Sequence, residues 1–535
     1  MTNLILDYWL PVRRASGAKE MITPWQITDR HEQDPIVALN TPRADFNGSL
    51  MQFLIGLLQT AVPPEKAYNE DWLDWLDKAP KPELLKEKFL TLQHAFNLDD
   101  DGPRFLQDFD ELKGDTKPID ALLIEAPGAN ALRNNTDHFI KRDGVQGLCP
   151  ACVASALFTL QTNAPSGGAG HRTSLRGGGP LTTLAMIDPG DQVGLTETLW
   201  RNLWLNVLSR YDFEALSDGA DKQADFDIFP WLTSTRTSDA KQGGKDTYPD
   251  DVNPLQMYWA MPRRIRLDWN NLREGECDIC GVTSNRLVIQ YTTQNYGINY
   301  SGPWKHPLSP HSLNKTDNTP LPRHPQPGGL TYRHWLRFVA DEELSEAARV
   351  ITAFNKRNPD NILQLRLWAF GYDMDNMKAR CWYETLYPLY LLDDTIRGLF
   401  IQRVQSLVSA AVEISGYVRS AIKEAWFKRP GDAKGDTSFL VEAFFQKTEN
   451  EFFSLSSRLE SELGADSDGV GVLNFWHGIL EKAAMALFDY WSTHGDVSVS
   501  NPRRIAIARN NLKKRLKAKR IKKLLQLPDS KEKAA

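Results

Sequence analysis

Residues 148–161 read LCPACVASALFTLQ, and this stretch does most to decide how the chain folds. Its C-x-x-C turn leads directly into a run whose apolar residues recur at three- and four-residue steps. That spacing is typical of one buried helix face. Pro150 stands where the first turn would begin, a position that tolerates the missing N–H of proline. The stretch therefore predicts a buried helix with a pair of cysteines at its start.

A second C-x-x-C turn, Cys277-Asp278-Ile279-Cys280, is followed by Gly281 and lies 124 residues further along the chain. Two such turns supply the four thiolates of a tetrahedral zinc ion, and a closed set of four leaves no position for a reacting ligand. We therefore expect a structural zinc ion that joins distant segments. Four reduced thiols without metal are the alternative. The expected ligands are Cys149, Cys152, Cys277 and Cys280.

The composition is that of a folded protein with more than one domain. The 535 residues are 41% hydrophobic and 24% charged, which is ordinary globular usage, and the chain is too long for one hydrophobic core. Residues 1–13 lack the pattern of a signal peptide, and the longest charge-free apolar stretch, 148–160, is too short to cross a bilayer. We expect a cytoplasmic protein without a membrane anchor, and reduced cysteines suit that compartment. Cys381 stands alone and is expected to be a buried small apolar side chain.

The pattern of elements changes once along the chain. Up to about residue 385, helical and extended segments alternate, whereas four long, glycine-poor helical segments follow Tyr387. Short connections between such helices predict an antiparallel bundle. We expect strands at 4–12 (ended by its proline), 264–267 and 286–292, helices at about 46–61 and 150–161, and bundle helices at about 391–428, 437–463, 471–493 and 501–526. The predicted fold class is α+β: a large mixed N-terminal domain (1–385) with the four-cysteine zinc site, a C-terminal four-helix bundle (386–527) and a disordered tail (528–535).

The chain has a formal net charge of −5, but its C-terminal end is strongly basic. Residues 501–535 hold thirteen Lys and Arg side chains against two acidic ones, so the rest of the chain is net negative. A solvated helix exterior is one interpretation, and contact with the phosphates of a nucleic acid is the one we favour. Ile505, Leu512 and Leu516 are the expected inner face of this last helix. Its basic residues are Arg503, Arg504, Arg509, Lys513, Lys514, Arg515, Lys517, Lys519, Arg520, Lys522 and Lys523, and Arg263, Arg264 and Arg266 are expected to extend a basic surface in the first domain.

A glycine-rich segment follows the first cysteine pair, and residues 166–180 read SGGAGHRTSLRGGGP. Six glycines let the backbone approach a ligand closely, and Arg172 and Arg176 supply charge for a phosphate. The spacing excludes a Walker loop, because no glycine stands five residues ahead of a G-K-[ST] triplet. A flexible surface loop without a ligand explains the composition equally well.

No catalytic constellation is visible in the sequence. It contains no G-x-S-x-G, H-E-x-x-H or EF-hand loop, and the isolated Asp137-His138 is more typical of a surface pair than of a nuclease core. A non-catalytic binding subunit explains this absence together with the closed thiolate set and the basic helix. The alternative is a zinc-stapled enzyme that acts on a nucleic acid or another phosphorylated substrate, with residues 166–180 as its anion cradle.

Taken together, these stretches resemble the CasA family, the large subunit of the type I-E CRISPR Cascade surveillance complex. The similar stretches follow one another in family order over most of residues 3–385, and beyond that only the four-helix character agrees. They are 3–13 (NLILDYWLPVR), 42–45 (PRAD), 148–183, the second C-x-x-C turn, 304–307 (WKHP) and 371–380 (GYDMDNMKAR).

The resemblance implies a subunit at one end of an RNA-guided complex that inspects the short motif beside a target in double-stranded DNA. The guide RNA then reads the rest by pairing. In this family the inspection is made from the minor groove, whose degenerate edges admit several motifs. It uses a glycine loop, a lysine finger and a polar wedge that starts strand separation by unstacking base pairs.

The family's DNA-reading positions can be matched to residues of this chain. The loop corresponds to Ser166, Gly167, Gly168, Ala169 and Gly170, with Arg172 beside it; the finger corresponds to Asn295; and the wedge corresponds to Asp375 and Asn376. Ala169 stands where a glycine is often found, Asn295 replaces a lysine, and the wedge residues are shorter than glutamine. The change at 295 bears on motif preference, and the shorter wedge bears on the depth of insertion.

The same resemblance implies further contacts. Phe139, Ile140, Lys141 and Arg142 correspond to a segment that helps anchor the subunit to the end of the guide RNA and to the neighbouring backbone subunits. The bundle would support the displaced DNA strand and touch the small helical subunit. From the charge of the last helix, and not from the resemblance, we expect Arg503, Arg504, Arg509 and Lys513 to contact DNA. A separate helicase-nuclease would be recruited, so cleavage would belong to another chain.

Overall fold

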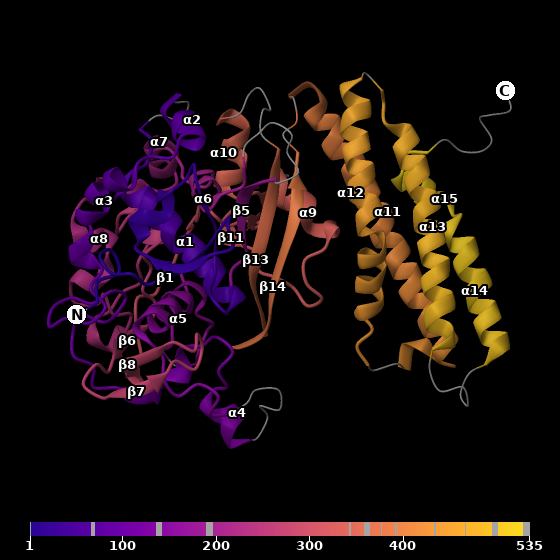
Figure 1. The fold of residues 1–535 in the computed structure, drawn as a ribbon. Helices are drawn as coiled ribbons and strands as arrows, with labels where there is room; N and C mark the ends of the chain where they lie inside the picture. The colour runs from indigo at the N-terminus through magenta and orange to yellow at the C-terminus, as the bar shows by residue number, and fades with distance from the viewer. Residues whose placement is uncertain are drawn as a thin grey trace. The chain divides into compact units, whose positions relative to one another are not determined.

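The computed structural model describes residues 2–65, 70–134, 142–168, 170–188, 196–341, 344–357, 364–375, 377–390, 392, 394–432, 435–465, 467–494 and 501–527. Contacts divide the chain into two compact units, Met1–Gln326 with Asp341–Leu389, and Pro327–Ala340 with Tyr390–Ala535. The strands belong to the first unit, and the second unit is built from helices (Figure 1).

Small antiparallel sheets form the framework of the first unit. In spatial order they are β2 (Lys19–Ile22), β1 (Leu10–Arg14) and β3 (Ile36–Leu39); β11 (Pro320–Pro322), β10 (His311–Leu313) and β12 (Ser345–Glu346); β14 (Lys378–Leu389), β13 (Leu365–Asp375) and β5 (Thr182–Ile187); β4 (Asp115–Pro118), β9 (Gln290–Gln294) and β6 (Arg264–Leu267); and β7 (Leu272–Glu276) with β8 (Thr283–Val288). The helices around them are α1 (Ala44–Ala61), α2 (Glu70–Asp77), α3 (Pro82–Leu90), α4 (Ala129–Arg133), α5 (Pro150–Asn163), α6 (Leu199–Trp204), α7 (Arg210–Glu214), α8 (Asp225–Ile228) and α10 (Arg349–Arg357). No single large sheet organises the described part of this unit, so its core depends on helices.

The core of the first unit is built around Phe53 on α1. Its ring makes edge-on contacts, a favoured aromatic geometry, at centroid distances of 5.3 to 5.9 Å. The partners are Trp9, Phe96, Phe105, Phe158 and Trp259. Phe158 comes from α5, which packs along α1. The cysteine pair at the start of α5 is therefore tied to the central aromatic cluster.

The helices expected at 46–61 and 150–161 are confirmed as α1 and α5, and the strand at 264–267 is confirmed as β6. Of the strand expected at 4–12, only residues 10–12 lie in a strand, β1. The first part is wrong, because the side chain of Asn3 accepts the amides of Ile5 and Leu6 at 2.9 and 3.2 Å and holds a turn there. The run expected at 286–292 is divided between β8 and β9, which belong to different sheets.

Pro11 does not end the first strand, because β1 runs through it. The carbonyl of Pro11 accepts the amide of Asn40 at 2.8 Å, so its missing N–H faces the same neighbour, β3. The pairing of β1 with β3 begins only at Val12 and Leu39. The proline therefore falls where no donor is required.

The second unit is a helical bundle. Its helices are α11 (Asp394–Trp426), α12 (Phe439–Gly464), α13 (Val470–Thr493), α14 (Pro502–Leu516) and α15 (Lys519–Leu524), with α9 (Tyr332–Val339) from the middle of the chain. The central helix α11 packs against all the others, and the long helices run side by side in Figure 1. Trp476 of α13 donates its indole N–H to the carbonyl of Leu407 on α11 at 3.0 Å. None of the described helices has the length and apolar character needed to span a membrane.

The last bundle helix is broken, although a continuous helix was expected at 501–526. Ala518 is extended, with ψ of 149°, and separates α14 from α15. The buried residues explain the break, because Leu512 and Leu516 are four apart whereas Ile521 follows Leu516 by five. A five-residue step does not stay on one helix face. With this correction, the predicted α+β fold with a cysteine cluster in its N-terminal part and a C-terminal bundle is confirmed.

Candidate metal centre and nucleic-acid interface

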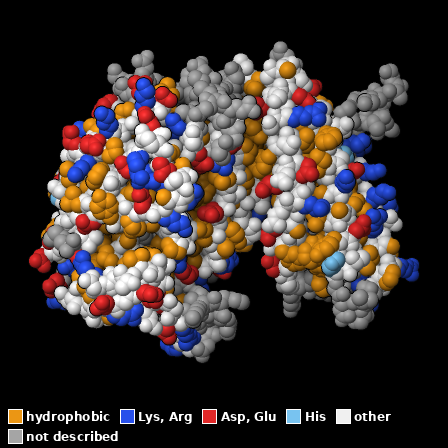
Figure 2. Space-filling view, viewed as in Figure 1, with side chains coloured by type: hydrophobic (Ala, Val, Ile, Leu, Met, Phe, Trp, Pro, Cys, Tyr) orange, Lys and Arg blue, Asp and Glu red, His pale blue; other side chains and the backbone are white. Residues whose placement is uncertain are grey.

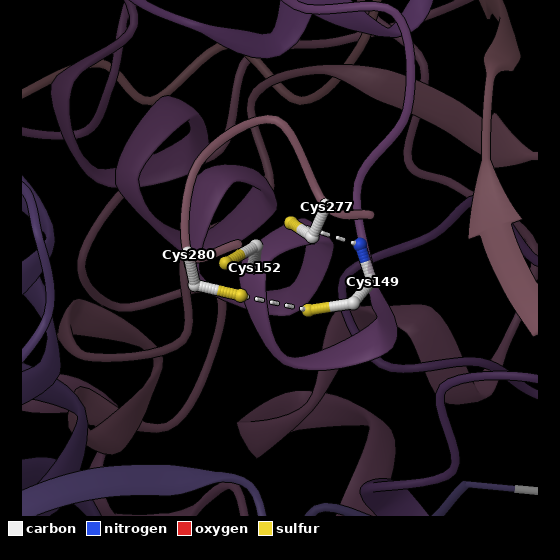
Figure 3. Close-up of side chains that lie close together, drawn as sticks. All are labelled: Cys149, Cys152, Cys277 and Cys280. Atoms are coloured by element: carbon white, nitrogen blue, oxygen red, sulfur yellow. Dashed lines mark hydrogen bonds between the residues drawn. The ribbon is translucent and has the colours of Figure 1, made fainter. Parts of the chain in front are cut away.

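The four paired cysteines come together in the first unit. Cys149 and Cys152 lie at the start of α5, and Cys277 and Cys280 lie in the turn between β7 and β8 (Figure 3). All four sulfur atoms lie within 4.8 Å of one another, and the Sγ atoms of Cys149 and Cys280 are 3.7 Å apart. None of the four forms a disulfide. The two distant turns thus build one compact cluster of thiols.

Backbone hydrogen bonds fix the two turns against each other. The amide of Cys149 donates to Sγ of Cys277 at 3.3 Å. The carboxylate of Asp278 accepts the amides of Gln146 and Gly147 at 2.7 and 2.8 Å. Gly281 has a left-handed φ of 72° and donates its amide to the carbonyl of Cys277 at 2.8 Å, a conformation that favours glycine. The cluster therefore rests on a rigid main-chain frame.

The cluster fits a tetrahedral metal ion. Zinc–sulfur bonds of about 2.3 Å place thiolate sulfurs about 3.8 Å apart. The Sγ atoms of Cys149 and Cys280 are 3.7 Å apart, and no two of the four sulfurs are more than 4.8 Å apart. Four thiolates complete the coordination of such an ion, so the arrangement can hold a metal ion and leaves no coordination position for a substrate.

Cys381 is exposed, so the expectation that it is buried is wrong. It lies on β14, which is the edge strand of its sheet. The third strand, β5, covers β13 only from Leu365 to Phe370 and ends before the half of the hairpin that carries Cys381. The thiol donates to the carbonyl of Trp382 at 3.3 Å.

The first half of the glycine-rich segment lies at the surface. Ser166 and Gly168 are exposed, and Gly167 and Gly170 are half-buried. Gly168 and Gly170 have left-handed φ values of 81° and 79°, which residues with side chains rarely adopt. The amide of His171 donates to the carbonyl of Gly168 at 3.3 Å and closes a compact turn. Ala169 lies outside the described residues.

This turn packs against the residues that follow β9. The amide of Tyr296 donates to the carbonyl of Gly170 at 2.7 Å. A Cβ built on Gly170 would lie only 2.8 Å from the Cβ of Asn295, so a larger residue at 170 would collide with it. Asn295 itself is exposed. The structure therefore brings the expected loop and the expected finger position side by side.

Tyr296 is a site residue that the sequence analysis missed. Its φ of 63° is unusual for a large side chain, and such strain is often kept at functional sites. Its carbonyl accepts the hydroxyl of Thr237 at 2.9 Å, and the guanidinium of Arg172 lies 5.8 Å from its ring centre. The only signal in the sequence is Asn295-Tyr296-Gly297, an asparagine and a glycine around a turn after a strand.

A polar groove of about 310 Å³ opens beside this contact, with His171, Thr237, Asp239, Asn295 and Tyr296 among its lining residues. Burial lowers the pKa of His171, and the positive charges of nearby basic side chains lower it further. The imidazole is therefore neutral at pH 7 and can both donate and accept a hydrogen bond. The charged side chains in the lining are Asp115, Asp239 and Arg264, and Arg264 is paired with Asp108. The groove thus offers hydrogen-bonding groups beside two carboxylates.

Arg172 and Arg176 occupy different environments. Arg172 is half-buried and donates to the hydroxyl and carbonyl of Ser238 at 2.7 and 3.2 Å, both of them neutral partners. Arg176 is only 4% exposed and is hydrogen-bonded inside the unit. The prediction that Arg176 offers charge to a phosphate is therefore wrong. The segment returns to the core through the bond from the amide of Ser174 to the carbonyl of Ala164 at 3.0 Å.

The three arginines at 263, 264 and 266 serve the fold, so the predicted basic surface there is wrong. Arg263 donates to the carbonyl of Pro165, and Arg264 forms a 2.6 Å ion pair with the fully buried Asp108. Arg266 donates to two backbone carbonyls at 2.9 and 3.0 Å. Each of the three therefore has an acceptor within the first unit, whereas the buried Nε of Arg263 has no hydrogen-bond partner among the described residues.

Asp375 is the last residue of β13 and lies at the tip of the β13–β14 hairpin. Its side chain is 58% exposed. Figure 1 shows the two strands of this hairpin. Among the described residues, no third strand pairs with the hairpin beyond Phe370, because the pairing with β5 stops there. Arg380 joins the two strands by binding Asp373 at 2.6 and 3.0 Å and lies 3.5 Å from Asp375. The second expected wedge residue, Asn376, lies outside the described part of the chain.

Arg504 and Arg509, both on α14, hold this helix against the rest of the bundle. Arg504 donates to the carbonyls of Ala425 and Trp426 at 2.8 and 3.0 Å and so caps α11. Arg509 binds Asp489 of α13 through two bonds of 2.6 and 2.8 Å. These two expected DNA contacts therefore have structural partners of their own.

Lysines dominate the outer side of α14 and α15. Lys513 and Lys517 line a groove of about 240 Å³ together with Glu481 of α13. Lys and Arg side chains gather over this side of the bundle in Figure 2. The exposed basic residues are Arg503, Arg509, Lys513, Lys514, Lys517, Lys519, Arg520 and Lys523. Of the expected inner face, Leu512 and Leu516 are buried, whereas Ile505 is half-buried and Ala508 takes its place.

The expected anchoring segment is described only at its end. Phe139, Ile140 and Lys141 lie outside the described residues. Arg142 is exposed and donates to the carbonyl of Leu132 at 3.1 Å. This bond ties the end of the segment back to α4.

Comparison with known proteins connects this architecture to a family. The sequence pattern of the family described as CRISPR-associated protein Cse1 matches residues 3–487. Solved structures with a similar fold include Thermus thermophilus CasA (Cse1), with a TM-score of 0.67 and 18% identity over 97% of this chain and 100% of that chain. Thermobifida fusca Cse1 has a TM-score of 0.70 and 15% identity over 99% of both chains. A chain described as a CRISPR RNA-guided surveillance complex has a TM-score of 0.66 and 16% identity over 97% of this chain and 99% of that chain.

Proposed function

The chain belongs to the CRISPR-associated Cse1 family, also called CasA, and we propose that it is the large subunit of a type I-E Cascade complex. In that role it recognises the short motif beside a target in double-stranded DNA from the minor groove, and it starts the separation of the strands. Guide RNA and the other Cascade subunits are its partners. A related chain is described as an RNA-guided surveillance complex, which supports this assignment.

The observation that carries the proposal is the exposed glycine turn with Asn295 at its side. Nothing lies within 4 Å of a Cβ built on Gly168, so the outer edge of the turn is open to a ligand. A backbone edge without side chains suits the minor groove, which is only about 6 Å wide. Asn295 adds an amide that both donates and accepts hydrogen bonds. Because it carries no charge, we expect a motif preference different from that of relatives with a lysine there.

The tip of the β13–β14 hairpin is the proposed wedge. Asp375 stands at the end of two strands that Arg380 braces, so the tip can enter the duplex as a stiff element. Insertion unstacks a base step at a cost of a few kcal/mol, which binding elsewhere must offset. Asn376 is its partner at the tip in this proposal.

The cysteine cluster is proposed to hold a structural zinc ion. Cys149, Cys152, Cys277 and Cys280 would supply its four thiolates, and the ion would link the start of α5 to the β7–β8 turn. The glycine-rich segment begins three residues after the end of α5. A fixed α5 therefore positions the turn that meets DNA.

The remaining partners are assigned to two other parts of the chain. We assign residues 139–142 to the guide RNA and the neighbouring backbone subunits, and the bundle to the displaced DNA strand and the small helical subunit. The expected domain division at 385 belongs to the same proposal, whereas the expected tail at 528–535 lies outside the described residues. A recruited helicase-nuclease performs the cutting, so this subunit supplies recognition.

The proposal predicts motif-dependent binding without cleavage. The chain would be assembled with guide RNA and partner subunits, then incubated with labelled duplexes that differ only in the motif, with Mg²⁺ or Mn²⁺ present. We expect binding that varies with the motif and intact DNA on a denaturing gel. Equal binding to every motif contradicts the recognition role, and metal-dependent cutting that follows the chain through purification favours the zinc-stapled enzyme instead.

Reversing the charge of Lys513 and Lys517 should weaken DNA binding for every sequence alike. Two lost phosphate contacts reduce the slope of log affinity against log salt by about 2, and we expect affinity to fall about three- to tenfold near physiological salt. Equilibrium binding at several salt concentrations measures both. Lys447→Glu, at an exposed position on α12, is the matched control. An unchanged salt slope in the double variant would remove this surface from the DNA interface.

A further inference from the structure

Arg176 is a buried cation without an acidic partner. The residue is 4% exposed, and its guanidinium is hydrogen-bonded to neutral side chains. It donates to the side-chain oxygens of Gln52, Thr182 and Ser309 at 2.5, 3.0 and 3.1 Å. Across the residues that the structure describes, no carboxylate forms an ion pair with it. A buried charge normally requires a counter-charge, because transfer out of water is unfavourable.

A small cavity lies against this guanidinium. A volume of about 20 Å³ is open to the centre of a water-sized sphere, with Gln52, Ser174, Arg176, Tyr258 and His306 among the lining residues. That is enough for one water molecule and also for a monatomic ion of slightly larger radius. No aspartate or glutamate belongs to the lining. The cavity is therefore positive and accepts only a very small occupant.

Tyr258 also lines this cavity and supplies a second donor. It is 5% exposed, and its hydroxyl is buried without a hydrogen-bond partner among the described residues. Its ring is held between Phe213, stacked at 5.9 Å, and His306, edge-on at 5.2 Å. Because the ring cannot move away, the hydroxyl needs an acceptor within the cavity.

We propose that this cavity binds a single monatomic anion, chloride in physiological solution, between the guanidinium of Arg176 and the hydroxyl of Tyr258. A water molecule would satisfy the hydroxyl but leave the buried charge uncompensated. A halide ion satisfies the hydroxyl because it accepts hydrogen bonds, and it compensates the buried charge because it is negative. Polyatomic anions such as glutamate are too large for the cavity.

The proposed anion site lies where the glycine-rich segment returns to the core of the first unit. Arg176 belongs to that segment, and Ser174, which also lines the cavity, donates its hydroxyl to the carbonyl of Gly177. The three acceptors of Arg176 come from α1, β5 and the loop before β10. A bound anion therefore stabilises the junction at which the segment returns to the core.

Thermal unfolding of the full chain tests the site. At matched ionic strength we expect a Tm about 1–2 °C higher in sodium chloride or bromide than in sodium glutamate, with a saturable dependence on halide. Tyr258→Phe should abolish this difference, since it removes one donor and keeps the ring contacts. Tyr300→Phe is the matched control and should keep it, because the hydroxyl of Tyr300 is bonded to Gln256 instead.

Crystals soaked in bromide provide the second measurement. We expect an anomalous peak between Arg176 and Tyr258 that is absent from Tyr258→Phe. Equal Tm values in halide and glutamate overturn the proposal even if a peak appears, because they mean binding at crystal concentration only. A halide effect that persists in Tyr258→Phe also overturns it, since the ion would then act elsewhere.

Discussion

Replacing Gly168 by aspartate is expected to weaken binding of the assembled complex to its double-stranded target by about ten- to hundredfold. Gly168 is exposed, its φ is 81°, and a Cβ at this position meets nothing within 4 Å. Aspartate is among the few residues that tolerate this conformation, so the fold should be kept. Its carboxylate would face DNA phosphates, and repulsion of about 1–3 kcal/mol follows at an exposed site. Equilibrium binding to a labelled duplex with the preferred motif measures the effect.

Two variants separate charge from shape in this experiment. Gly168→Asn has nearly the same size as the aspartate and tolerates the same backbone, but it carries no charge. Gly17→Asp adds a carboxylate at another exposed glycine, with φ of 88° and equally open surroundings in the β1–β2 turn. We expect both to bind far better than Gly168→Asp. Wild-type affinity in Gly168→Asp would show that residues 166–170 do not meet the DNA.

Loss of one metal ligand is expected to have the largest effect on stability. Cys277→Ser removes a thiolate that is 2% exposed and should release the metal, because three thiolates and a hydroxyl hold zinc weakly at neutral pH. We expect the free energy of unfolding to fall by about 3 kcal/mol or more and Tm by about 5 °C or more. Metal analysis of the wild-type chain should give one zinc per molecule, and differential scanning fluorimetry measures the Tm.

Cys381→Ser is the matched control for this change. It removes an exposed thiol outside the cluster, so zinc content and Tm should stay at the wild-type values. A strong chelator should lower the Tm of the wild-type chain to that of Cys277→Ser. If metal-free and metal-loaded chains unfold at the same temperature, the cluster is four reduced thiols and the zinc assignment is wrong.

The two halves of the cysteine cluster could be predicted from the sequence because the geometry of each turn is encoded locally, whereas their meeting depends on the tertiary fold. Each C-x-x-C turn presents two sulfurs to one point, and Gly281 and Pro150 mark the turn and the helix that follow. The bundle was also predictable, since its helical periodicity extends over long segments. The break at Ala518 leaves one signal in the sequence, the five-residue step from Leu516 to Ile521. This step lies within a run of lysines and arginines, so a continuous helix was expected instead.

The environments of individual arginines could not be predicted. Arg172 and Arg176 are four residues apart in one glycine-rich segment, yet one is half-buried near the groove and the other lies in the core. The difference depends on acceptors from distant segments, such as Gln52 and Ser309, whose meeting is a property of the tertiary fold. For the same reason, the contact between Gly170 and Asn295 could not be read from the residues alone.

The distance along the chain between the two cysteine turns affects the order in which the protein forms during synthesis. Cys149 and Cys152 leave the ribosome more than a hundred residues before Cys277. At ordinary rates of translation that delay is on the order of ten seconds. During this interval the first pair of thiols has no partner, so the proposed metal ion would be captured late in biogenesis. Metal starvation should therefore harm newly made chains far more than chains that are already complete.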